Sequence, residues 1–179
     1  MNVRPATAAD IPAMLDLERQ CPAAAHWSPQ HYDDLFCTRE DGARRFVLVL
    51  DESAEGSERG PESQLESSSS RAVLRTLGFL IAHHVHSEWE LENLVVAPAF
   101  RRRGLATRLL TALLLHARET NSQSVFLEVR ESNQEARALY IRAGFEESGR
   151  RRLYYTNPQE DAVQYSLVLT HRLTSHPSL

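Results

Sequence analysis

The stretch from residue 93 to residue 106, Asn-Leu-Val-Val-Ala-Pro-Ala-Phe-Arg-Arg-Arg-Gly-Leu-Ala, runs from an apolar strand pattern through a basic turn into a helix. Gly104 and Ala106 leave the backbone of the first helical turn uncluttered, so that its free amides can face an anion. The helix dipole favours negative charge there, and Arg101, Arg102 and Arg103 add positive field. These residue types, in this order, predict a cradle for a phosphate-bearing group such as a pyrophosphate.

The alternative for this stretch is a solvated basic turn before an ordinary amphipathic helix. An isolated Arg-x-x-Gly-x-Ala pattern does not exclude that alternative, because such short patterns often arise by chance. The choice depends on whether the rest of the chain supplies matching chemistry.

A second block of sequence could supply proton transfer. Residues 127–133 are Leu-Glu-Val-Arg-Glu-Ser-Asn, and residues 138–145 are Ala-Leu-Tyr-Ile-Arg-Ala-Gly-Phe. The Glu128 carboxylate can accept a proton, and the Tyr140 phenol, with an ordinary pKa near 10, can donate one within an aligned complex. Without the flanking motifs, a solvated strand glutamate and a core helix aromatic would be the better interpretations.

The histidines and cysteines do not form a pattern for metal or thiol chemistry. In a strand, His83 and His84 face opposite sides and only His84 shares a side with His86, so we expect solvated histidines and no metal site. Cys21 and Cys37 lie sixteen positions apart without CxxC spacing, which supports neither a disulfide framework nor a zinc ribbon. A reducing, cytoplasmic location is expected.

Strand and helix patterns alternate around the two blocks, as in α/β folds. Apolar runs predict strands at residues 2–4, 46–50, 73–82, 89–96, 124–129, 147–154 and 162–169. Helical spacing predicts two early helices capped by Thr7 and Ser28, and two later helices at residues 104–119 and 133–143. Gly144 is expected to close the last helix.

Composition bounds the fold and excludes several classes of function. A chain of 179 residues with 42% hydrophobic content fits one domain with its own core. All 20 lysine and arginine positions hold arginine, which excludes a Schiff-base lysine and a GxxxxGK phosphate loop. The net charge of -4 argues against direct nucleic-acid binding, and no pattern predicts export or a membrane span.

The segment from Asp51 to Arg71 is rich in Ser, Glu and Gly and ends in four serines followed by the arginine. It has too few apolar residues to pack, so we predict a mobile, acidic, Ser-rich surface loop at 51–71. Its glutamates could attract an arginine-rich partner, or the segment could be a solvated tether.

Together, the two blocks resemble the GNAT superfamily of N-acetyltransferases. Arg101, Gly104 and Ala106 match the [Q/R]-x-x-G-x-[G/A] signature, and residues 127–145 match the L-E-V-R-x-S-N, A-x-x-L-Y and G-F segments. The L-E-V-R form, Trp27-Ser28 and the late Arg-Leu-Tyr-Tyr run are most similar to the bacterial ribosomal-protein-alanine N-acetyltransferase group.

This resemblance implies the fold. It implies a single α/β domain over residues 1–179, of the α+β GNAT kind, with a mixed central sheet of about seven strands and helices on both faces. The central strands should part at Val95-Val96, where their exposed backbone groups could bind the pantetheine arm of acetyl-CoA.

The resemblance also implies roles for site residues. Glu128 would be the general base, acting directly or through water, and Tyr140 the general acid that protonates the departing thiolate. Glu90 or Glu92, which share one face of their strand, could replace Glu128 as base. The residues expected to bind acetyl-CoA are Leu94, Val95, Val96, Arg101, Arg102, Arg103, Gly104, Leu105, Ala106, Thr107 and Asn133.

The implied acceptor is the N-terminal α-amine of a protein, with ribosomal protein alanine as the candidate, acetylated by direct transfer in a ternary complex. Tyr154 and Tyr155 would hold an extended peptide. An α-amine with a pKa of about 7.8 is roughly a quarter neutral at cytosolic pH, whereas a lysine amine is about 0.1% neutral. The alternatives are acetylation of a small-molecule amine and a non-catalytic acyl-CoA sensor.

Overall fold

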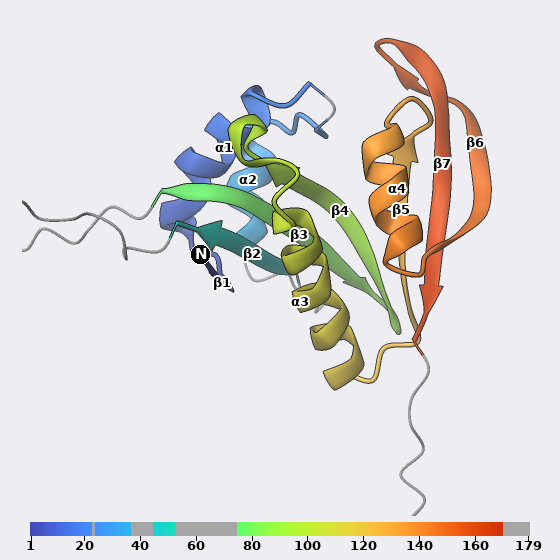
Figure 1. The fold of residues 1–179 in the computed structure, drawn as a ribbon, viewed down its shortest axis with the longest axis horizontal. Helices are drawn as coiled ribbons and strands as arrows, with labels where there is room; N and C mark the ends of the chain where they lie inside the picture. The colour runs from blue at the N-terminus through green and yellow to red at the C-terminus, as the bar shows by residue number, and fades with distance from the viewer. Residues whose placement is uncertain (23, 37–44, 53–74, 170–179) are drawn as a thin grey trace, which may run out of the picture.

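The computed structural model describes residues 1–22, 24–36, 45–52 and 75–169. In it, the segments with apolar strand patterns form one seven-stranded sheet. The strand order is β1-β2-β3-β4-β5-β7-β6 (Figure 1). β4 and β5 run parallel and the other neighbouring strands are antiparallel, so the sheet is mixed. The strands are β1 (Asn2–Pro5), β2 (Arg45–Asp51), β3 (Thr76–Val85), β4 (Glu88–Val96), β5 (Ser124–Arg130), β6 (Glu146–Thr156) and β7 (Gln159–Val168).

Side-chain caps and glycine set the ends of the helices. Ser28 Oγ accepts a hydrogen bond from the His31 amide at 3.4 Å, and Asn133 Oδ1 accepts one from the Ala136 amide at 3.2 Å. Gly144, with φ of 94°, ends the last helix. The helical segments are η1 (Ala8–Asp10), α1 (Ile11–Arg19), α2 (Pro29–Asp33), η2 (Asp34–Phe36), η3 (Pro98–Phe100), α3 (Leu105–Glu119) and α4 (Gln134–Arg142).

Helices cover both faces of the sheet, because alternate strand residues point to opposite sides. On one face, α1 and α2 bury Met14 and Tyr32 against Val47 and Val49 of β2. On the other face, α3 and α4 pack on Leu48 and Leu50 of β2. They also pack on the side chains of β3, β4, β5 and β7 that point to this face. The fold class, the mixed seven-stranded sheet and the two helical layers are therefore as predicted.

The pairing of β4 with β5 stops half-way along β4. Residues 88–91 pair with residues 124–127, and no pair follows in this ladder. Between β3 and β4 the register slips at Ile81 and Ala82, which leaves Glu92 as the extra residue of a β-bulge. Because a bulge bends and twists its strand, β4 turns away from β5 beyond this point (Figure 1). The strands thus part at Glu92, earlier than the predicted position at Val95-Val96.

Two further details differ from the sequence-based expectations. β3 continues to Val85, and His86 lies in the following turn with φ of 56°, so the strand argument does not apply to His86. Asp51 is the buried last residue of β2, where it pairs with Arg4 at 2.7 Å, instead of opening a loop. Residues 53–71 of the predicted loop, residues 73–74 of the predicted strand and Cys37 lie outside the described residues. None of the described helices has the length and apolar character needed to cross a membrane.

Candidate active site

The amino end of α3 forms an open cradle. Gly104 precedes the helix with φ of 74°, a conformation that costs other residues about 1–2 kcal/mol, and its carbonyl accepts from the Arg108 amide at 3.1 Å. A Cβ at Gly104 would meet no heavy atom within 4 Å, so space lies directly in front of this turn. The first amides of a helix have no intrahelical acceptor and can therefore bind an anion placed in that space.

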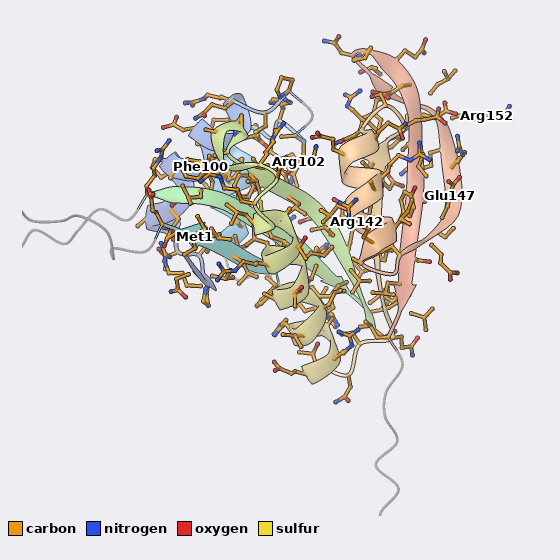
Figure 2. The ribbon with its side chains drawn as sticks, viewed as in Figure 1. Met1, Phe100, Arg102, Arg142, Glu147 and Arg152 are labelled. Carbon is orange, nitrogen blue, oxygen red and sulfur yellow. The ribbon has the colours of Figure 1, made fainter. Side chains whose placement is uncertain are left out.

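This cradle opens into a cavity of about 630 Å³ where β4 has parted from β5. The walls come from the end of β4, the turn before α3, the first turn of α3, and α4. Arg102 and Arg142 reach the cavity from its two sides (Figure 2). The lining residues are Cys21, Ala24, Leu94, Val95, Val96, Phe100, Arg101, Arg102, Gly104, Leu105, Ala106, Thr107, Asn133, Gln134, Glu135, Ala136, Ala138, Leu139, Tyr140 and Arg142.

The three arginines of the turn make different contacts. Arg101 is folded back, with Nε 3.4 Å from the Val96 carbonyl oxygen and Nη2 3.3 Å from Cys21 Sγ. Arg102, at φ of 63°, pairs with Glu135 at 3.7 Å across the cavity mouth. Arg103 does not line the cavity; its guanidinium carbon lies 5.1 Å from the centre of the Phe100 ring.

Tyr140 brings a phenol to the cavity from α4. Its ring is buried and lies 5.8 Å from the Phe145 ring and 6.3 Å from the Tyr165 ring, measured between centroids. Among the described residues, no hydrogen-bond partner is present for its hydroxyl. Burial raises the pKa of Tyr140 above that of a free phenol, with a further contribution from Tyr155, so the hydroxyl keeps its proton as a donor.

Glu128 points to the opposite face of the sheet. It lies between Leu127 and Val129, which are buried in the core beneath α3 and α4, so its side chain emerges on the other side of β5. Arg151 Nη1 donates to both carboxylate oxygens, at 3.1 and 3.3 Å, and Gln164 Nε2 donates to Oε1 at 3.0 Å. The two predicted proton-transfer groups thus reach the parting of β4 and β5 from different faces.

Tyr155 interacts electrostatically with both Glu128 and Tyr140, which lie on different faces of the sheet. Burial, and then the charge of Glu128, raise the pKa of Tyr155 to about 12, and Tyr155 in turn raises the pKa of Tyr140. Its ring is held by Arg130, whose guanidinium carbon lies 4.1 Å from the ring centre. The neighbouring Tyr154 is 43% exposed, so this pair offers both a half-buried and an exposed phenol.

Two further carboxylates lie on the Glu128 face. Glu92 pairs with Arg45 at 3.2 Å, whereas no ion pair or hydrogen bond engages Glu90 within the described parts of the chain. The pKa of Glu90 is raised, first by burial and then by the charges of Glu92 and Glu128. Across the described residues, no group of three His, Cys, Asp or Glu side chains is arranged to hold a metal ion.

Comparison with known proteins assigns this architecture to a family. The model of the acetyltransferase (GNAT) family matches residues 11–145, which is most of the chain. The chain belongs to the GNAT family of acetyltransferases. The matched region includes the cradle at the start of α3 and the segments that carry Glu128 and Tyr140.

Individual relatives are bacterial acetyltransferases. The [ribosomal protein bS18]-alanine N-acetyltransferase of Haemophilus ducreyi is 38% identical over 96 residues, and that of Salmonella typhimurium is 40% identical over 98 residues. These alignments cover 52% and 54% of this chain and 66% of each relative, just under two thirds of their length. The crystal structure of the Escherichia coli ribosomal-protein-S18-alanine N-acetyltransferase is similar with a TM-score of 0.71 and 25% identity, covering 99% of both chains.

The GNAT cavity gathers most of the residues predicted to bind the acyl donor. All of them line it except Arg103, and Asn133 does so while its side chain also caps α4. Glu128, Tyr154 and Tyr155 lie outside this lining, on the other side of the strand gap.

Sequence reasoning missed several cavity residues of this GNAT domain. Cys21 and Ala24 come from the segment that follows α1, and only the packing of that segment on β4 brings them to the cavity. Arg142 carried a usable signal, because it lies one helical turn after Ala138 and Leu139 of the same helix, which also line the cavity.

Proposed function

We propose that this GNAT member is an acetyl-CoA-dependent N-acetyltransferase that acetylates the N-terminal α-amine of a protein, with a ribosomal protein alanine as the candidate acceptor. The observation that carries the proposal is the approach of Tyr140 and Glu128 to the parting of β4 and β5 from opposite faces. An acyl donor in the cavity and an amine on the Glu128 face would meet at that point, which allows direct transfer in a ternary complex.

The cavity offers groups that could bind both the pyrophosphate and the pantetheine arm of acetyl-CoA. The open space at Gly104, with the first amides of α3 around it, would hold the pyrophosphate, and Arg102 and Arg142 would add positive charge. Leu94, Val95 and Val96 would provide strand backbone groups to the pantetheine arm, since β5 does not pair with this part of β4. Bound acetyl-CoA would supply an acetyl group activated as a thioester.

The proposed proton path begins at Glu128 and ends at Tyr140. The acceptor amine must lose its proton to become a nucleophile, and the carboxylate of Glu128 would take that proton directly or through water. The Tyr140 hydroxyl, which keeps its proton at neutral pH, would hydrogen-bond the leaving sulfur and donate to it. Because the pKa of this phenol is raised, its contribution depends on alignment more than on acidity.

Acceptor choice would depend on the two tyrosines of β6. Tyr155 is anchored beside Glu128, and Tyr154 presents an exposed ring, so an extended peptide could pack there with its first residue at the strand gap. The names of the bacterial relatives, which describe alanine acetylation of ribosomal protein bS18, support the same acceptor class.

A small-molecule polyamine is the second candidate acceptor. It is favoured by the proximity of Glu90 and Glu128 on the acceptor face, since a flexible polycation could bind both carboxylates at once. Glu90, which has no ion-pair partner in the part of the chain that the structure describes, is also an alternative base to Glu128.

Release of CoA from acetyl-CoA by the purified protein tests the proposal. The acceptors should be a peptide that begins with Ala-Arg-Tyr, the same peptide with a blocked N-terminus and an internal lysine, and spermidine. Release with the free peptide alone supports α-amine acetylation. Release with spermidine alone would replace it by the polyamine function, and acetyl-CoA binding without release from any acceptor would contradict both.

A further inference from the structure

The ion pair between Arg151 and Glu128 occupies the surface that an acceptor has to reach. One nitrogen of Arg151 contacts both oxygens of Glu128, and the third hydrogen bond to the carboxylate comes from Gln164. A new cation that binds Glu128 must therefore share or replace the contact made by Arg151.

The Arg151 side chain is held by weaker contacts than the Glu128 side chain. The Arg151 side chain is 51% exposed, and its other neighbour is the exposed ring of Tyr154, 4.0 Å from the guanidinium carbon. Glu128 is only 18% exposed and keeps its bond from Gln164, whose side chain lies against Gly149. Because exposed ion pairs contribute little stability, Arg151 can leave while Glu128 stays in place.

The charges on this face favour replacement by another cation. Glu92 is neutralised by Arg45, and both of those side chains are largely buried. Glu90 has no such partner among the described residues, and Arg151 also lies close enough to affect it. If Arg151 moved away with no replacement, Glu90 and Glu128 would face each other as uncompensated carboxylates, which is unfavourable in a partly buried site.

We propose that Arg151 holds, in the free protein, the place on Glu128 that the ammonium group of the acceptor takes, and that the acceptor enters by displacing it. The acceptor then binds in its charged form and gives up its proton only after binding. Arg151 is a selectivity residue in this arrangement, because a neutral group cannot replace its charge on Glu128. This inference rests on the proposed function, since it concerns the acceptor side of the same site.

A matched pair of arginine variants tests the inference by steady-state kinetics. Arg151→Gln removes the competing cation, so the KM for the Ala-Arg-Tyr peptide should fall by about two- to fivefold, the range that corresponds to an exposed ion pair. The KM for acetyl-CoA should not change. Arg151→Lys keeps a cation and should restore a KM close to that of the original protein.

Arg152→Gln is the control, because Arg152 points outward from β6 (Figure 2) and no hydrogen bond, ion pair or ring contact engages it in the described residues. It should leave both KM values unchanged. Two results seen in Arg151→Gln and not in Arg152→Gln would overturn the inference: a rise in peptide KM, or a lower kcat with unchanged peptide KM. In either case Arg151 would serve only to position Glu128.

A measurement without turnover separates this inference from the proposed function. In protein labelled with ¹⁵N-arginine, the Arg151 Nε signal is assigned by its loss in Arg151→Gln. That signal should shift when the peptide with a free N-terminus, or spermidine, is added. It should not shift with a further control peptide that has a blocked N-terminus and contains neither lysine nor arginine. If neither ammonium compound moves the signal at saturation, displacement is wrong whatever the acetylation assay gives; if the signal moves but no acetylation follows, the proposed function fails alone.

Discussion

The guanidinium carbon of Arg130 lies 4.1 Å from the centre of the Tyr155 ring, and the same guanidinium pairs with Glu160 at 2.6 Å. It also donates to the carbonyl oxygens of Asn157 and Pro158, at 3.1 and 3.4 Å. One side chain of β5 thus fixes the turn between β6 and β7 and the ring that lies beside the proposed base. Arg130 is a positioning residue for the acceptor side.

Arg130→Gln should therefore weaken use of the acceptor without affecting the acyl donor. Loss of the cation–π contact and the ion pair should lower kcat/KM for the acceptor peptide by about tenfold, because Tyr155 is no longer held. The acetyl-CoA KM should stay the same, since Arg130 does not line the cavity. Steady-state kinetics with each substrate varied in turn measures both, with Arg152→Gln as control, and an equal rise in both KM values would contradict the positioning role.

Tyr140→Phe should separate turnover from binding of the acyl donor. Removal of the proposed general acid should lower kcat by about 10²- to 10⁴-fold, because the sulfur would leave without its proton. The affinity for acetyl-CoA, measured by calorimetry, should change by no more than about twofold, since the ring stays in the core. Tyr32→Phe is the control: its hydroxyl is buried away from the cavity lining, and its loss should leave kcat unchanged.

Glu128→Gln and Glu90→Gln should differ in their pH–rate profiles. With Glu128 as base, Glu128→Gln lowers kcat/KM by about 10²-fold or more, most strongly at low pH where the amine is protonated, and Glu90→Gln retains most activity. A Glu90 base would behave differently. Because the pKa of Glu90 is raised, activity would fall with decreasing pH already above the usual carboxylate range, and Glu90→Gln would remove that limb. This second pattern would transfer the role to Glu90.

The fold and much of the cavity lining were predictable from local sequence. The helix that follows Gly104 and the strand that carries Glu128 are predicted by spacing and caps that lie within a few residues of each other. The bulge at Glu92 was not predictable, because Glu-Leu-Glu-Asn continues a regular alternation and an extra residue in the ladder leaves no mark in it. The Arg151 contact also escaped, since it depends on register shifts in β6 and on a partner 23 positions away.

Asp10 should make the stability of the domain depend on pH. Its carboxylate accepts from Arg4 Nη1 and Nη2 at 2.9 and 2.7 Å, and from the Thr7 amide at 2.8 Å. The hydrogen bonds from Arg4 lower the pKa of Asp10 in the folded state. A lowered folded pKa gives stability that is present above the unfolded pKa of about 4 and lost as the pH falls through the folded value.

Asp10→Asn should accordingly reduce the free energy of unfolding at pH 7 by about 2 kcal/mol, the range for charged hydrogen bonds, and by less at pH 3. Urea denaturation at the two pH values measures the difference. Asp16→Asn is the matched control, because the Asp16 pair with Arg19 is 2.8 Å long but two-thirds exposed, and its loss should cost about 0.5 kcal/mol or less. If Asp10→Asn destabilised the protein equally at pH 7 and pH 3, the charge of Asp10 would not be what stabilises the link between β1 and η1, and packing of the side chain would have to account for it.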